Sequence, residues 1–188
     1  MPGPNDDDTD VIDRAAGLAA GDPVHVARRF RAKVVDATQA SHDALLGQPV
    51  EGLSTADRLR VAVHVCTLAG AASLARHYAE RLADHEPAGA TAVATASGRG
   101  ATAETDAAGR AKPPSPSPAL PAMLAFASKL TTDPRLGDRA AIDALKRAGL
   151  GDAAIVALAQ LVAFLSYQLR VVAGLRAMRA LHDRESAR

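Results

Sequence analysis

The sequence is short of several residue types, and each shortage excludes a class of function. Among 188 residues there is one cysteine, Cys66, and no tryptophan. A single cysteine cannot form an intrachain disulfide, which fits a reducing compartment, and it cannot run two-cysteine redox chemistry within one chain. Lys and Arg together number 22 against 21 Asp and Glu, so the chain lacks the basic surplus typical of nucleic-acid or anionic-membrane binding.

No segment has the pattern of an exported or membrane-spanning protein. The N-terminus, Met-Pro-Gly-Pro-Asn-Asp-Asp-Asp, is acidic where a secretory signal is basic. The longest charge-free stretch, Ala153 to Leu169, is shorter than the roughly 20 apolar residues of a spanning helix. We therefore expect a cytoplasmic protein that binds neither membranes nor nucleic acid.

Helical periodicity and capping signals predict an all-α domain of about six helices. Start signals are Asp10, Asp22 followed by Pro23, the Ser54-Thr55-Ala56-Asp57 capping box, Pro121 and Asp138. The second helix is expected to reach Gly47, the third to be long with a possible bend at Gly70, and the last to run from about Asp152 to Leu181. No segment alternates with period two, so no sheet is expected. The basic run Arg28, Arg29, Arg31 and Lys33 is interpreted as a solvated face.

The helices fall into two halves of one domain. Residues 10–85 and 119–182 carry the helical patterns, and residues 86–118 are mostly Ala, Gly, Thr, Ser and Pro. Such a composition buries too little apolar area to offset its ordering entropy, so this stretch is predicted to be a disordered linker. Residues 1–9 and 183–188 are predicted tails.

Two segments carry a resemblance to a known superfamily. Leu53 to Tyr78 resembles the signature helix of the carboxymuconolactone decarboxylase and AhpD-like alkylhydroperoxidase superfamily, in which a capped helix is followed by Asn-Gly and Cys-x-x-Cys-x-x-x-His. Ala148 to Leu175 resembles the Gly-Leu-Ser-Asp…Phe…Asn-Tyr-Gln…Arg…Gly-Leu helix of its peroxidase-related branch. The resemblance implies an AhpD-like helical domain, oligomeric assembly and peroxiredoxin-type reduction of hydroperoxides.

The same resemblance places no sulfur where that chemistry needs it. With Gly70 at the family glycine, the two cysteine positions hold Ala71 and Leu74, and the proton-relay histidine position holds Tyr78. In the family a thiolate attacks the peroxide and a second cysteine resolves the sulfenic acid. The resemblance therefore implies a member that has lost the redox cysteine pair.

The remaining candidate catalytic residues are His77, Tyr78 and Arg170. His77 neighbours the relay position, although a partly exposed histidine on an amphipathic helix is the simpler interpretation. Arg170 is the only charge between Ala153 and Leu175 of the last helix, and it either packs against a partner group or binds an anionic substrate. Cys66 lies on an apolar stripe, where core packing is favoured over reactivity. The sequence contains no metal-ligand spacing and no glycine-rich nucleotide loop, so neither a metal nor a cofactor is expected.

Three functional hypotheses follow. The first is a non-catalytic member that forms a homo-oligomer, or a hetero-oligomer with a cysteine-bearing AhpD-like relative. The second is a thiol-independent, decarboxylase-like enzyme acting on a small organic acid by acid–base chemistry, with His64, His77, Tyr78 and Arg170 as candidates. The third is a one-cysteine peroxidase that uses Cys66.

The last helix carries two apolar stripes on nearly opposite sides. The first is Ile155, Leu158, Val162, Leu165, Leu169 and Val172. The second is Val156, Phe164, Tyr167, Val171, Leu175 and Met178. Because a peripheral helix buries only one stripe, we expect the other to lie against a second subunit, giving at least a homodimer.

Overall fold

A computed structural model describes residues 10–85 and 116–187 of the chain. Over these residues the protein is entirely helical, without strands, which confirms the predicted all-α class. The elements are α1 (Val11–Ala16), α2 (Pro23–Arg29), α3 (Ala32–Gly47), α4 (Thr55–Leu68), α5 (Ala72–His85), α6 (Leu120–Thr132), the 3₁₀ helix η1 (Pro134–Leu136), α7 (Arg139–Arg147) and α8 (Asp152–Ser186). Residues 1–9 and 86–115, which include most of the predicted linker, lie outside the described residues.

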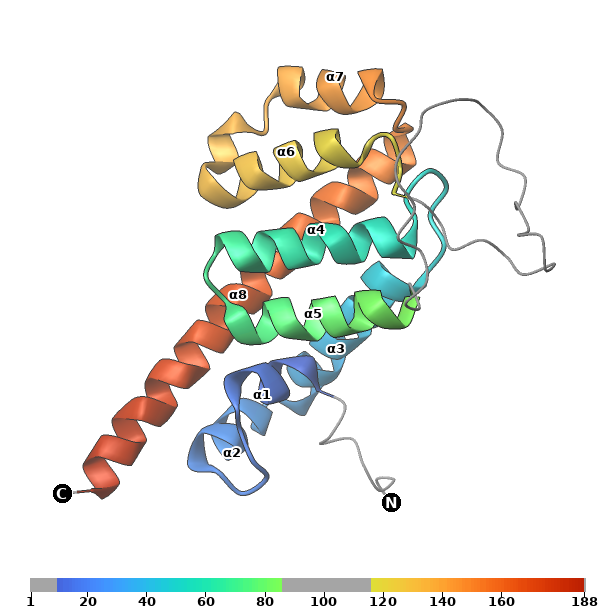
Figure 1. Ribbon diagram of the computed structural model, residues 1–188. Coiled ribbons are helices and arrows are strands. Elements are labelled where there is room, and N and C mark those ends of the chain that lie inside the picture. Colours follow the sequence, from blue (N-terminus) through green and yellow to red (C-terminus); the bar gives the residue numbers. More distant parts are fainter. Residues whose placement is uncertain (1–9, 86–115, 188) are drawn as a thin grey trace.

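The helices pack around an antiparallel pair formed by α4 and α5 (Figure 1). On one side of this pair α6 packs on α4, and α7 lies beyond α6. On the other side lie α1 and α2. The long helix α8 crosses the whole assembly and contacts α1, α3, α4 and α6. Helices from both halves of the sequence therefore share one core.

The predicted helix starts are confirmed by hydrogen bonds. The side chains of Asp10, Asp22, Ser54 and Asp138 each accept from a backbone N–H two or three residues later, at 2.8 to 3.0 Å. Such caps satisfy donors that have no partner inside the helix.

The predicted third helix is two helices, because Gly70 ends the first of them. Gly70 has a left-handed φ of 69°, which a residue with a side chain adopts only with strain. Its N–H donates to the Thr67 carbonyl, and the next N–H, of Ala71, donates to the Cys66 carbonyl at 2.9 Å. This is a Schellman cap, and the chain reverses after it instead of bending. Ser73 therefore belongs to α5 and is not part of the apolar stripe of Cys66 on α4.

The predicted second helix is also divided, between Arg29 and Ala32, at a point without glycine or proline. Arg28 donates to Asp13 at 2.7 Å and to Asp10 at 3.0 Å, and Arg29 donates to Asp13 at 2.8 Å. Both carboxylates are buried. The interpretation of this basic run as a solvated face is therefore wrong for its first two arginines, which fix α2 against α1.

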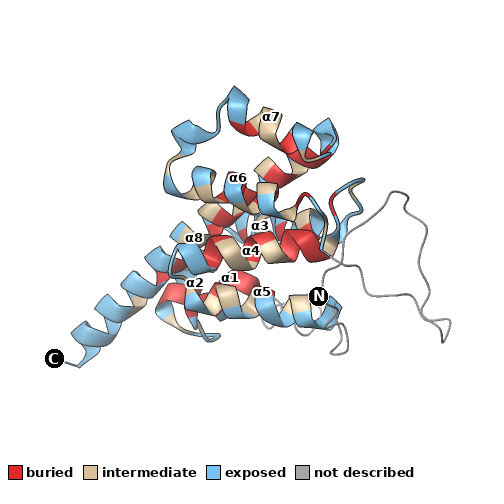
Figure 2. Cartoon of the chain, turned by 45° about the horizontal axis from the view of Figure 1, so that its top comes forward, coloured by how far each residue is buried: buried red, intermediate tan, exposed pale blue. Residues whose placement is uncertain are grey.

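Helix α8 explains why two apolar stripes were visible in the sequence. Five of the six residues of the first stripe are buried in the core, and Leu169 is half-buried. Most of the second stripe is exposed or half-buried, and the C-terminal part of the helix projects beyond the other elements (Figures 1 and 2). By length and composition alone α8 is apolar enough to cross a membrane, and 39% of its most apolar window is buried in this fold. It ends at Ser186, five residues past the predicted Leu181 and inside the predicted tail.

Candidate functional site between helices α3, α5 and α8

The centre of the candidate site is a fully buried tyrosine. Tyr78 on α5 is 0% exposed, and its hydroxyl donates to Gln168 Oε1 of α8 at 2.6 Å. Burial raises the pKa of Tyr78 far above its ordinary value. Tyr78 is therefore a neutral donor that links α5 to α8, and it does not titrate near neutral pH.

A second ring, His42 of α3, lies against Tyr78 and was missed in the sequence. Its ring centroid is 6.0 Å from that of Tyr78 and 5.9 Å from that of His77. His42 Nε2 is 3.2 Å from the Arg81 guanidinium, and its Nδ1 is 2.9 Å from Asp43 Oδ1. A guanidinium only donates, so Nε2 accepts and Nδ1 carries the proton given to Asp43. Burial lowers the pKa of His42 and so favours this neutral form.

The third ring, His77, faces a different environment from its neighbour Tyr78. It lines a cavity between α1 and α5, and its Nε2 is buried without a hydrogen-bond partner among the described residues. Burial, together with the positive charges of Arg81 and Arg14, lowers the pKa of His77 to about 4. His77 is therefore neutral at pH 7.

Arg170 does not join these residues. It follows Gln168 by two positions on α8, which is about 200° around a helix, and its side chain is exposed. Arg170 therefore does not pack into the core, because the face of α8 that carries it is open at this point. His64 is also elsewhere: its Nε2 is 2.7 Å from Ser128 Oγ of α6. The four acid–base candidates of the decarboxylase-like hypothesis thus do not converge on one pocket among the described residues.

Cys66 is placed as the core-packing interpretation predicts. Its side chain is 0% exposed on α4, and burial raises the pKa of the thiol to about 12. A peroxidatic cysteine must instead be an accessible thiolate beside a cation. The one-cysteine peroxidase hypothesis is therefore wrong.

The positions that correspond to the family cysteines lie where α5 begins. Ala71 is in the turn after Gly70, and Leu74 is 0% exposed in the core. Over residues 10–85 and 116–187, no group of three or more His, Cys, Asp or Glu side chains could hold a metal ion. What remains is a Tyr–Gln contact, a neutral histidine pair and a small cavity.

Comparison with known proteins supports the fold and goes no further. No family model and no curated protein matches the sequence. A solved structure of an uncharacterized peroxidase-related protein from Silicibacter sp. TM1040 is similar at a TM-score of 0.50 and 17% identity, over 93% of this chain and 92% of that chain. At this identity the likeness shows a shared fold alone, because one fold carries many functions. The chain has the fold of a peroxidase-related protein.

Proposed function

We propose that this protein is a non-catalytic, AhpD-like relative of the peroxidase-related fold, and that it works by assembling with copies of itself. The chemistry of the site supports the first part. No thiol stands at Ala71 or Leu74, the thiol of Cys66 is buried and protonated, and the Tyr78 hydroxyl is engaged by Gln168.

The observation that carries the second part is an exposed apolar surface, here called the apolar face. It comprises large apolar side chains of α2, α3 and α8, and of Phe30 between α2 and α3, that are between 42% (Tyr167) and 88% (Phe30) exposed. Its members are Val26, Phe30, Val34, Tyr167, Met178 and Leu181.

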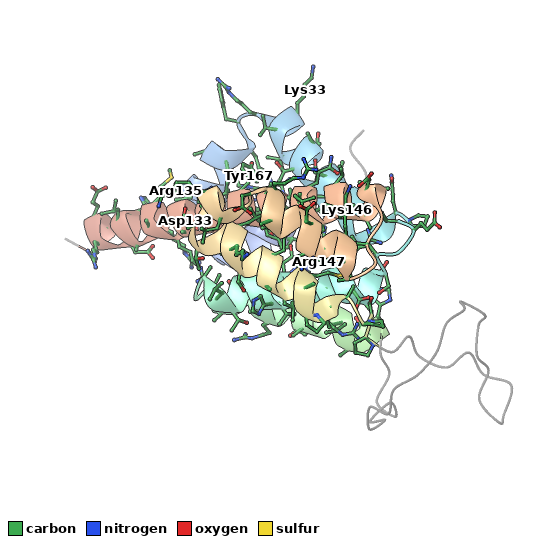
Figure 3. The ribbon with its side chains drawn as sticks, turned by 90° about the horizontal axis from the view of Figure 1, so that it is seen from above. Lys33, Asp133, Arg135, Lys146, Arg147 and Tyr167 are labelled. Atoms are coloured by element: carbon green, nitrogen blue, oxygen red, sulfur yellow. The ribbon has the colours of Figure 1, made fainter. Side chains whose placement is uncertain are left out.

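The members of the apolar face on α8 lie next to the helices that carry most of its other members. Thr38 Oγ1 lies 3.3 Å from the Tyr167 hydroxyl, and it also donates to the Val34 carbonyl one turn earlier. Toward the other end, Met178 and Leu181 line a groove of about 290 Å³ together with Val24 of α2. Figure 3 shows Tyr167 on α8 and Lys33 projecting from the first turn of α3. The α8 members of the apolar face thus border α3 at one end and α2 at the other.

The apolar face is large enough to contribute much of the free energy that association needs. Covering a large side chain that is about half exposed gains roughly 1 kcal/mol, so six on each of two copies supply on the order of 10 kcal/mol. Association costs roughly 4 to 15 kcal/mol in lost freedom, which this gain offsets in large part. Exposed apolar surfaces of this kind mark interaction sites.

Light scattering on size-exclusion fractions, from about 1 to about 100 µM, tests the proposal. The wild-type protein is expected to be a dimer or larger, and Phe30→Glu, which places a charge at the most exposed member of the apolar face, is expected to be monomeric. Leu136→Glu is the matched control, since Leu136 is 47% exposed on η1, at the far end of the molecule from α2 (Figure 1).

A wild-type monomer throughout the series, or Phe30→Glu assembling like wild type, would overturn self-assembly. Assembly that appears only when a cysteine-bearing AhpD-like protein is added would replace it with the hetero-oligomer.

A further inference from the structure

A cavity of about 240 Å³ between α1 and α5 has no part in the assembly surface. Its walls are formed by both helices, with charged and polar groups mostly from α5. The residues that define it are Val11, Arg14, Ser73, Arg76, His77 and Glu80.

Two polar atoms at this cavity are buried and have no hydrogen-bond partner among the described residues. They are Ser73 Oγ and His77 Nε2, four residues apart and so one above the other on the same face of α5. More than nine in ten buried polar groups in proteins are partnered, so these two atoms are hydrogen-bonding groups left over for a water molecule or a polar ligand in the cavity.

The charges around the cavity favour a singly charged anion. Arg14 and Arg76 contribute two positive charges and Glu80 one negative charge, which leaves a net charge of +1 at neutral pH. Ser73 also lies in the first turn of α5, where the helix dipole is positive.

We propose that this cavity binds a short-chain monocarboxylate. The Ser73 hydroxyl and the neutral His77 ring each donate a hydrogen bond to the carboxylate, Arg76 pairs with its charge, and Val11 contacts its hydrocarbon part. A phosphate dianion would leave the cavity with excess negative charge beside Glu80. The site adds a ligand to the assembly proposed above and does not depend on it, since none of these residues belongs to the apolar face.

Titration of the full-length protein with sodium butyrate, followed by the imidazole NMR resonances of His77, tests the site. Sodium phosphate and sodium chloride at equal ionic strength are the comparison probes. We expect a saturable shift with butyrate and a rise in the His77 pKa when butyrate is bound, because the anion cancels the surrounding positive potential.

Arg76→Gln is expected to weaken butyrate binding about tenfold, the value typical of losing one charge-assisted hydrogen bond. Arg170→Gln, an exposed arginine on α8, is expected to bind like wild type. Shifts that do not saturate, shifts reproduced by chloride, tighter binding of phosphate than of butyrate, or equal affinity in wild type and Arg76→Gln would each overturn the proposal. The two proposals can fail separately. A wild-type protein that forms the oligomer but does not bind butyrate would overturn the cavity site and leave the assembly proposal standing.

Discussion

Replacing Tyr78 with phenylalanine tests whether this residue is structural. The variant keeps the ring but removes the hydroxyl that donates to Gln168 Oε1 at 2.6 Å. Gln168 is 1% exposed, and its Nε2 already lacks a partner among the described residues, so both ends of its amide would be unsatisfied. Leaving a buried acceptor without its donor costs about 1 to 3 kcal/mol. For a chain of this size each kcal/mol lowers the melting temperature by roughly 2 to 4 °C.

The assay is a double-mutant cycle measured by urea denaturation. Gln168→Leu alone is expected to cost a similar amount, because it leaves the buried Tyr78 hydroxyl without an acceptor. The double variant, with apolar groups on both sides, is expected to recover most of the loss, giving a coupling free energy of about 1 to 3 kcal/mol. Tyr167→Phe is the control: its hydroxyl meets Thr38 at 3.3 Å in an exposed position, so a change within about 0.5 kcal/mol is expected. Additive losses in the cycle, or a Tyr78→Phe protein as stable as wild type, would refute the reasoning.

Three further predictions concern other buried groups. Arg58→Met should destabilise the fold by about 3 kcal/mol in urea denaturation, because it orphans the Leu45 and Gln48 carbonyls that the buried guanidinium binds at 2.6 and 2.8 Å. Cys66 should react with a thiol reagent only after unfolding, since the pKa of the thiol is raised to about 12, and hydroperoxide turnover should be the same for wild type and Cys66→Ser. His77 has a folded pKa of about 4 against an ordinary 6.5, so the unfolded chain binds more protons between these values. Stability should therefore fall as the pH drops from 6.5 to about 4, and less steeply in His77→Gln.

The parts of the fold that depend on local rules were predictable. Asp10, Asp22, Ser54 and Asp138 cap helices because a short polar side chain before an apolar period satisfies the first free N–H groups. Gly70 was recognised as a special position, but its effect was underestimated. A bend and a reversal look alike in sequence, and the choice depends on whether α5 finds a surface on α4 to pack against.

The break before Ala32 could not be predicted, because no glycine or proline marks it and long-range ion pairs from Arg28 to Asp10 and Asp13 favour it. The same limit applies to the site. His77 and Tyr78 were identified by their place beside a family motif, whereas His42 joins them from another helix through tertiary packing. A histidine at helical spacing from the buried Val35 and Leu46 was the only local sign of it.

The apolar face was foreseen only in part. The second stripe of α8 was visible as a helical repeat, but Phe30 was assigned to the interior of a longer helix. In the structure Phe30 lies in the break between α2 and α3 and is 88% exposed. Helical periodicity thus reveals the members of the apolar face on α8, whereas the exposure of Phe30 is seen only in the tertiary structure.

Hydrogen–deuterium exchange at two protein concentrations tests the central claim most directly, because it locates the surface that assembly covers. If copies of this chain associate through the apolar face, amides of residues 23–35 and 164–182 should exchange more slowly at about 50 µM than at about 0.5 µM, while those of α7 should not change. The Phe30→Glu protein should show no concentration dependence. Exchange that is independent of concentration in wild type, or protection confined to α6 and α7, would contradict the account.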